Sequence, residues 1–233
     1  QRSWFKKANR EELLNEYGYF SYVWCMIDTA VTKKESSDYS VMMVFAKSSN
    51  NNNVYILELV RLKERLPDFI QIGKEKWDYW SDKLSSNYHA MPSLIGIENT
   101  QAGISCADSL DDLGLPTSLI TPKRDKYSRL SEVLGTIKKG IVHVPEDATW
   151  VSPFFEECEC FRADLKHVLM NNEKKPHDDM VDCLAYGLNK YYFDSMNVEV
   201  INNPDILSPQ QEYMLELTYE TAVESVNNMM MSL

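Results

Sequence analysis

The stretch "FSYVWCMIDTA", residues 20–30, is a hydrophobic run that is rich in aromatic and β-branched residues and reaches Asp28. These residue types favour a β-strand. Two further runs of this kind follow after short polar segments, "YSVMMVFAK" at 39–47 and "VYILELVRLK" at 54–63. Three strands joined by short polar loops predict an antiparallel meander.

Helix and strand patterns alternate along the next part of the chain. In chain order we expect helix 67–87, strand 92–99, helix 101–114, strand 116–122, helix 125–140, strand 141–145 and helix 148–167. This order predicts an α/β fold with a mixed sheet, antiparallel on one side and parallel on the other, and helices on both faces. Functional residues are then expected at the carboxyl ends of the central strands.

The composition fits one large domain, since 44% of the 233 residues are hydrophobic. The net charge is −11, but residues 1–140 carry 19 basic and 18 acidic side chains, whereas residues 141–233 carry 5 and 17. The overall charge therefore does not exclude a local phosphate-binding face. The five cysteines are scattered without a zinc pattern and are expected to be reduced. The sequence has neither a signal peptide nor an apolar run of about 18 residues, so it suggests neither secretion nor a membrane span.

Two acids follow buried-looking strands, Asp28 after "VWCMI" and Glu98 after "SLIGI". Either acid alone could simply cap a turn. Because they end two strands of one predicted sheet, they could also belong to one site.

The stretch "KKPHDDMVDCLAYG", residues 174–187, predicts a helix that is acidic in its first turns. At about 100° per residue, Asp178, Asp179 and Asp182 share one quadrant beside an apolar arc. Like charges this close raise one another's pKa unless a cation lies among them. Oxygen ligands without paired His or Cys favour Mg²⁺ or Mn²⁺ over zinc. The alternative is a capped helix with two solvated acids and one structural acid.

Four nearby residues have both a functional and a structural interpretation: His177, Asp38, Asn99 and Thr100. His177 could be a ligand or general base, but its position on the apolar side favours capping or packing. Asp38 could support the acidic cluster or form a turn before a strand. Asn99 and Thr100 follow Glu98 and could contact substrate.

The strand that reaches Asp28, the segment "GIENTQAG" with Glu98, and "KKPHDDMVDCLAYG" together resemble the nuclease domain of the large subunit of tailed-phage DNA-packaging terminases. That domain has the ribonuclease H-like fold, which Holliday-junction resolvases and transposases share. The resemblance covers roughly residues 20–195. It implies that residues 1–19 connect to an N-terminal ATPase motor. Residues 196–233 are expected from their own sequence to form an acidic, partly helical tail. No Walker phosphate loop occurs in the sequence, so no ATP site is expected.

The resemblance implies an endonuclease that cuts concatemeric double-stranded DNA during packaging, with two Mg²⁺ or Mn²⁺ ions. Asp28 and Glu98 match the ligands from the strands. On the helix Asp182, Asp179 and then Asp178 are the expected ligands, with Asp28, Glu98, Asp179 and Asp182 as the catalytic set. The implied partners are the ATPase motor, the portal and the small terminase subunit, in the cytoplasm of the infected bacterial host. The fragment itself is expected to be monomeric.

Basic side chains between residues 123 and 139 are candidates to hold DNA phosphates, although each could equally be a solvated surface cation. These candidates are Lys123, Arg124, Lys126, Arg129, Lys138 and Lys139. Two other functions remain open at this point. One is a junction resolvase or transposase-like nuclease of the same fold, and the other is a non-catalytic DNA-docking or adaptor module.

Overall fold

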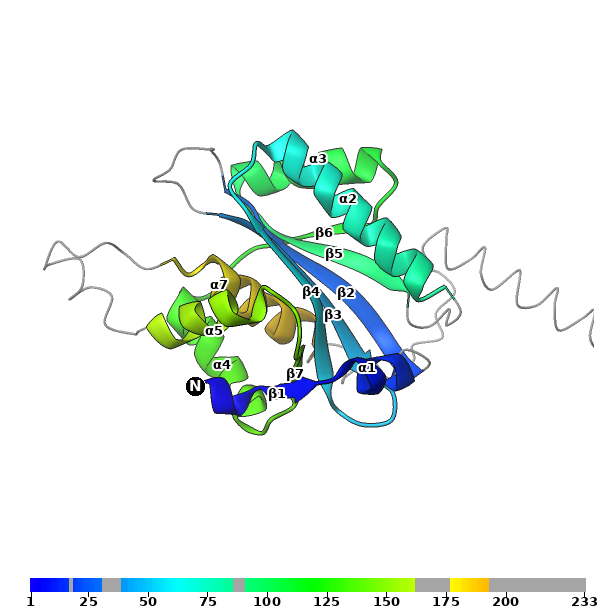
Figure 1. The fold of residues 1–233 in the computed structure, drawn as a ribbon. Helices are drawn as coiled ribbons and strands as arrows, with labels where there is room; N and C mark the ends of the chain where they lie inside the picture. The colour runs from blue at the N-terminus through cyan, green and yellow to red at the C-terminus, as the bar shows by residue number, and fades with distance from the viewer. Residues whose placement is uncertain (17–18, 31–38, 86–90, 162–176, 193–233) are drawn as a thin grey trace, which may run out of the picture. The chain divides into compact units, whose positions relative to one another are not determined.

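The computed structural model describes residues 1–16, 19–30, 39–85, 91–161 and 177–192, and in this part of the chain seven strands form one mixed sheet with helices on both faces (Figure 1). The elements in chain order are η1 (Arg2–Trp4), β1 (Lys6–Ala8), α1 (Arg10–Glu16), β2 (Phe20–Asp28), β3 (Ser40–Ser48), β4 (Val54–Leu62), α2 (Leu66–Lys83), β5 (Pro92–Glu98), α3 (Gln101–Asp112), β6 (Thr117–Ile120), α4 (Lys126–Lys138), β7 (Val142–Pro145), α5 (Val151–Cys160), α7 (Asp179–Tyr186) and the π-helical turn η4 (Gly187–Tyr192). Two expectations, Asp38 and the tail 196–233, lie outside the described residues.

The strands lie in the order β1-β7-β4-β3-β2-β5-β6. The meander is confirmed, because β3 pairs antiparallel with both β2 and β4. On one side β5 and β6 continue the sheet in parallel, and on the other side β7 runs parallel to β4. Parallel strands therefore flank the meander on both sides, not on one side as expected, since the chain returns through α4 to the opposite edge.

The first residues of the chain contribute to this sheet. Lys6–Ala8 forms β1, which pairs parallel with β7 at the edge. The sequence pattern did not predict this strand, because it is three residues long and its two lysines are exposed. The connection to an ATPase motor proposed for residues 1–19 stays a prediction.

Side-chain alternation along the strands decides which face of the sheet each acid points to. On β2, Trp24 and Met26 pack in the apolar cluster beneath α4, α5 and α7. Asp28 continues this alternation and points to the same face. On β5, Ile97 packs in the opposite cluster, beneath α2 and α3, so Glu98 points away from it. Both strand-end acids therefore face the layer that contains α7.

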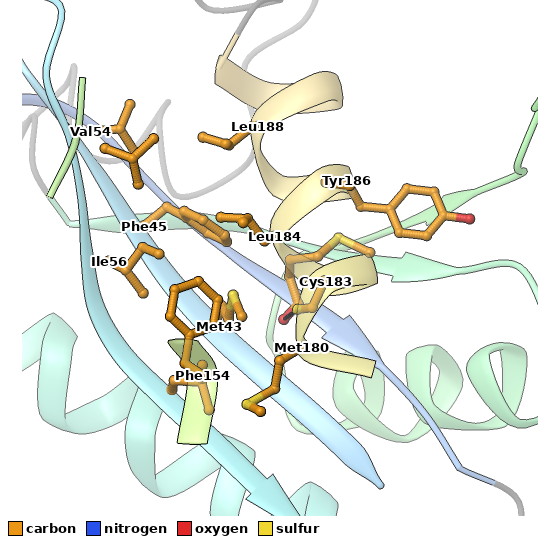
Figure 2. Packing of buried hydrophobic residues seen from close by; sticks show 14 of the residues in the cluster. Met43, Phe45, Val54, Ile56, Phe154, Met180, Cys183, Leu184, Tyr186 and Leu188 are labelled. Carbon is orange, nitrogen blue, oxygen red and sulfur yellow. Dashed lines mark hydrogen bonds between the residues drawn. The ribbon is translucent and has the colours of Figure 1, made fainter. Parts of the chain in front are cut away.

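The helix α7 is fixed on β2 and β3 by apolar packing and two hydrogen bonds. Figure 2 shows Leu184 beside Phe45, and every residue of α7 is buried. The Cys183 thiol donates to the carbonyl of Met26 at 3.2 Å, and the Trp24 indole N–H donates to the carbonyl of Gly187 at 3.1 Å. The acids of α7 are thus carried on a helix that packs directly on the sheet.

Two further observations bear on the sequence predictions. All five cysteines are free thiols: Cys25, Cys106, Cys158, Cys160 and Cys183. Among the described helices, none combines the length and the apolarity that crossing a bilayer requires.

Candidate metal centre

Asp28 and Glu98 are neighbours at the carboxyl end of a parallel strand pair. In the register of β2 and β5, Ile27 lies opposite Ile97, so the next residue on each strand is an acid. The pKa of Asp28 is raised well above its usual range, first by enclosure in the protein and then by the charge of Glu98. Because carboxylates perturb one another only at short range, the two acids share one site.

The acids of α7 reach the same site. The charges of Asp182 and Asp179 also raise the pKa of Asp28, while Lys126 lowers it. Asp178, Asp179 and Asp182 are all buried. The structure thus brings together Asp28, Glu98, Asp179 and Asp182. Asp178 joins this group because Lys126 pairs with both Asp178 and Asp182.

Each of these acids on α7 has hydrogen-bond or ion-pair partners. Asp182 accepts a hydrogen bond from Arg129 Nη2 at 2.7 Å and forms an ion pair with Lys126. Asp178 accepts from Lys126 Nζ at 3.1 Å. Asp179 Oδ2 accepts from the backbone N–H of Tyr39 at 3.2 Å.

The two cations come from the start of α4, which packs beside α7. Burial by itself lowers the pKa of Lys126, but the attraction of Asp182 and Asp178 raises it by more, so the net shift is upward. The side chain of Arg129 is buried, donates to the carbonyl of Arg124 at 2.8 Å, and stacks with its Cζ 4.3 Å from the ring centre of Tyr186. These cations offset part of the repulsion among the acids.

Tyr186 links the helix to the acid on β5. Its hydroxyl donates to Glu98 Oε1 at 3.0 Å. Burial and the charge of Glu98 raise the pKa of this phenol, so it stays protonated and remains a donor. Sequence reasoning missed Tyr186, although its spacing of four residues from Asp182 places both on one side of α7.

Glu157 on α5 is a buried acid that sequence reasoning missed. Its Oε1 accepts hydrogen bonds from the backbone N–H groups of Met180 at 2.6 Å and Val181 at 3.1 Å, and its Oε2 lies 3.1 Å from Arg61 Nη2. Burial raises the pKa of Glu157 to about 7, against the lowering effect of Arg61 and the two N–H groups. Its spacing of three residues from the buried Phe154 was the signal that could have revealed it.

His177, Thr100 and Asn99, for which the sequence left both a functional and a structural interpretation, make contacts within the protein. The ring of His177 packs edge-on against Tyr39 with centroids 4.8 Å apart, and its Nδ1 lies 3.7 Å from Asp179 Oδ2. Thr100 caps α3 by accepting from the N–H of Gly103 at 3.0 Å. The amide of Asn99 donates to the hydroxyl of Thr121, also at 3.0 Å.

The six basic candidates for DNA contact divide by position along α4. Lys126 and Arg129 lie in the acidic site, and Arg124 forms an ion pair with Glu132. Lys138 lies at the other end of α4, a helix of 13 residues and therefore about 20 Å long. The remaining two candidates, Lys123 and Lys139, are exposed. Contact with DNA stays a prediction for all six.

The donor set is suited to a hard divalent cation. It consists of buried carboxylate oxygens, the ligands that Mg²⁺ and Mn²⁺ prefer. Within the described ranges, no three His, Cys, Asp or Glu side chains are arranged to hold a metal ion as they stand. Instead, Lys126 and Arg129 supply positive charge to the acids of α7.

A mixed sheet with acids at two neighbouring strand ends, facing an acidic helix, defines a fold of the ribonuclease H-like class. The chain belongs to the terminase RNaseH-like domain family, whose model matches residues 26–191. No curated protein sequence matches the chain.

Solved structures of terminases have the same fold. The large terminase of a thermophilic bacteriophage is 12% identical with a TM-score of 0.55, over 74% of this chain and 40% of that one. The human cytomegalovirus terminase nuclease domain is 13% identical with a TM-score of 0.55, over 82% and 93% of the two chains. The same domain, Mn-soaked and inhibitor-bound, is 12% identical with a TM-score of 0.54, over 77% and 89%. The match thus spans less than half of the phage large terminase.

Proposed function

We propose that this chain is the nuclease part of a large terminase and that it cuts double-stranded DNA during genome packaging with the help of divalent metal ions. The observation that carries the proposal is the convergence of acids from two neighbouring strand ends and one helix: Asp28 and Glu98 follow the paired residues of β2 and β5, and Tyr186 of α7 donates to Glu98. Enclosure and the charges of Glu98, Asp182 and Asp179 raise the pKa of Asp28 there. Perturbed carboxylates gathered at strand ends are typical of catalytic sites. Family membership favours this function over a junction resolvase or a transposase.

The residues proposed to hold Mg²⁺ or Mn²⁺ are Asp28, Glu98, Asp182 and Asp179, with Asp178 next. Manganese in the related cytomegalovirus domain supports this choice of metal. A pair of divalent ions supplies charge that stabilises a phosphodiester transition state and lowers the pKa of the attacking water. Mutual repulsion among the carboxylates favours the binding of such positive charge.

The surrounding residues orient these carboxylates. Tyr186 fixes one oxygen of Glu98, Arg129 fixes Oδ1 of Asp182, and the N–H of Tyr39 fixes Oδ2 of Asp179. Groups held in this way lose little freedom when a ligand binds, which favours binding and catalysis.

DNA is proposed to approach along the loop that precedes α4. Lys123 and Arg124 lie there, within three residues of Lys126 at the acidic site. Such cations position phosphates without reading the sequence. Lys138 and Lys139 would contact the duplex about 20 Å away, at the far end of α4. The motor, the portal and the small terminase subunit are the proposed partners, within the infected host's cytoplasm.

Cleavage of supercoiled plasmid by the 233-residue chain tests this function. We expect nicked and linear products with Mn²⁺ and none with a chelator. Asp28→Asn and Asp182→Asn should abolish cleavage, whereas Asp108→Asn, an exposed change of equal charge on α3, should not. Wild-type protein that never cuts DNA, or an Asp28→Asn variant that cuts as well as wild type, would contradict the proposal.

A further inference from the structure

The two cations in the acidic site are held very differently. Arg129 has a side chain that is 9% exposed, and its guanidinium is fixed by Asp182, a backbone carbonyl and the Tyr186 ring. Lys126 has a side chain that is 43% exposed, and its ammonium contacts Asp178 and Asp182. An ammonium on a flexible, solvent-accessible stem leaves a site more readily than a stacked and buried guanidinium.

The two cations also divide the oxygens of Asp182 between them. Arg129 binds Oδ1, and Lys126 binds Oδ2. A metal ion that used Asp182 as a ligand would need one of these oxygens. Because Arg129 is anchored by groups other than Asp182, Oδ2 is the oxygen that can become available.

The charge balance points the same way. Among the described residues of this site, five carboxylates lie with the cationic side chains of Lys126 and Arg129, so the acids outnumber the cations there. A divalent ion would supply more positive charge at the same place than the Lys126 ammonium does. The metal ion and the ammonium would repel each other at contact distance. Binding of the metal and retention of the ammonium are therefore in competition.

We propose that Lys126 is an exchangeable internal cation, which occupies Oδ2 of Asp182 in the metal-free protein and is displaced when a divalent ion binds. This inference rests on the proposed function only in taking Asp182 as a metal ligand. It assigns Lys126 a role in setting metal affinity, and it requires Lys126 to move to solvent when the site is loaded.

Equilibrium Mn²⁺ binding to the full chain without DNA tests the competition, by calorimetry or by the electron paramagnetic resonance of free Mn²⁺. We expect Lys126→Gln to bind Mn²⁺ roughly tenfold more tightly than wild type, because a repelling charge at contact distance is removed. Lys123→Gln removes the same charge from an exposed position nearby and should change affinity by less than about twofold. Equal affinities for Lys126→Gln and wild type, or an equal gain in Lys123→Gln, would overturn the proposal.

Lysine reactivity provides a second measurement that needs no variant. Reductive methylation of wild-type protein, followed by mass spectrometry, should modify Lys126 slowly without metal and severalfold faster with saturating Mn²⁺, while Lys123 is unchanged. A rate at Lys126 that Mn²⁺ leaves unaltered would contradict displacement. If the wild-type protein cuts DNA but both measurements give the contradicting result, only the displacement of Lys126 is refuted. Success in both tests without any DNA cleavage would refute the nuclease function alone.

Discussion

Glu157 accepts a hydrogen bond from the backbone N–H of Met180 at 2.6 Å, so the amino end of the acidic helix α7 is capped by a carboxylate from α5. Asp178 stands at the N-cap position of α7 but makes no capping bond with its side chain. It instead accepts from Lys126. Glu157 thus supplies the side-chain cap at the amino end of α7 that Asp178 does not supply.

Glu157→Ala should lower the free energy of unfolding by about 3 kcal/mol, because two buried N–H groups and Arg61 lose a charged partner. Urea denaturation of the full chain measures the change. Glu156→Ala, on the exposed side of the same helix, should stay within about 0.5 kcal/mol of wild type. Similar losses in the two variants would contradict the capping role of Glu157.

The stability of the protein should fall as pH rises through the range set by Glu157. Its pKa is about 7 in the folded protein against an ordinary value of 4.5, so between these values the folded state binds more protons than the unfolded state. This difference corresponds to about 3 kcal/mol lost between the ordinary and the raised pKa. Denaturation at several pH values should show a flatter profile for Glu157→Gln than for wild type. The pKa of Asp28 is raised in wild type and in Glu157→Gln alike, so its contribution cancels from the comparison. If stability changed with pH equally in wild type and in Glu157→Gln, the raised pKa of Glu157 would be refuted.

Gly187→Ala should destabilise the packing of α7 on the sheet. A Cβ there would lie 2.4 Å from Cε2 of Phe45, beneath the helix. Relieving this overlap costs about 1–3 kcal/mol. Gly135→Ala in α4, where a Cβ meets nothing within 4 Å, should instead stabilise by up to about 1 kcal/mol. Thermal unfolding distinguishes the two, and equal melting temperatures would argue against the close contact.

Arg129→Met should destabilise the metal-free protein by about 3–5 kcal/mol, because it removes a buried partner of Asp182. Arg124→Met removes an exposed ion pair with Glu132 and should cost no more than about 1 kcal/mol. Saturating Mn²⁺ should recover part of the loss in Arg129→Met, since it replaces positive charge in the site. An Arg129→Met protein as stable as wild type would show that Asp182 does not depend on this cation.

The sequence predicted those elements whose signals are local. Hydrophobic runs bounded by polar turns indicated β2 and β5 and placed Asp28 and Glu98 at their ends, as the structure has them. The helices expected at 101–114 and 125–140 end in the structure at Asp112 and Lys138, each two residues before a glycine with positive φ, Gly114 and Gly140. The gathering of the acids also followed from local patterns, namely two strand ends and one helical quadrant.

What the sequence did not predict depends on contacts between distant segments. The strand β1 exists only by pairing with β7, and no pattern in three residues indicates that. The capping of α7 by Glu157 requires α5 to lie at its amino end. The sequence named Lys126 and Arg129 as candidate DNA contacts from their charge, but it did not indicate that α4 packs beside α7 and pairs both with the acids. Charge alone does not say which partner a cation faces.

The most direct test of the metal centre is a crystal of the chain soaked in Mn²⁺ and measured for anomalous scattering. We predict Mn²⁺ peaks within coordination distance of Asp28, Glu98 and Asp182, with contacts from Asp179 or Asp178. The contradicting result is a fully soaked crystal in which these carboxylates have no Mn²⁺ peak among them and keep Lys126 and Arg129 as their cations.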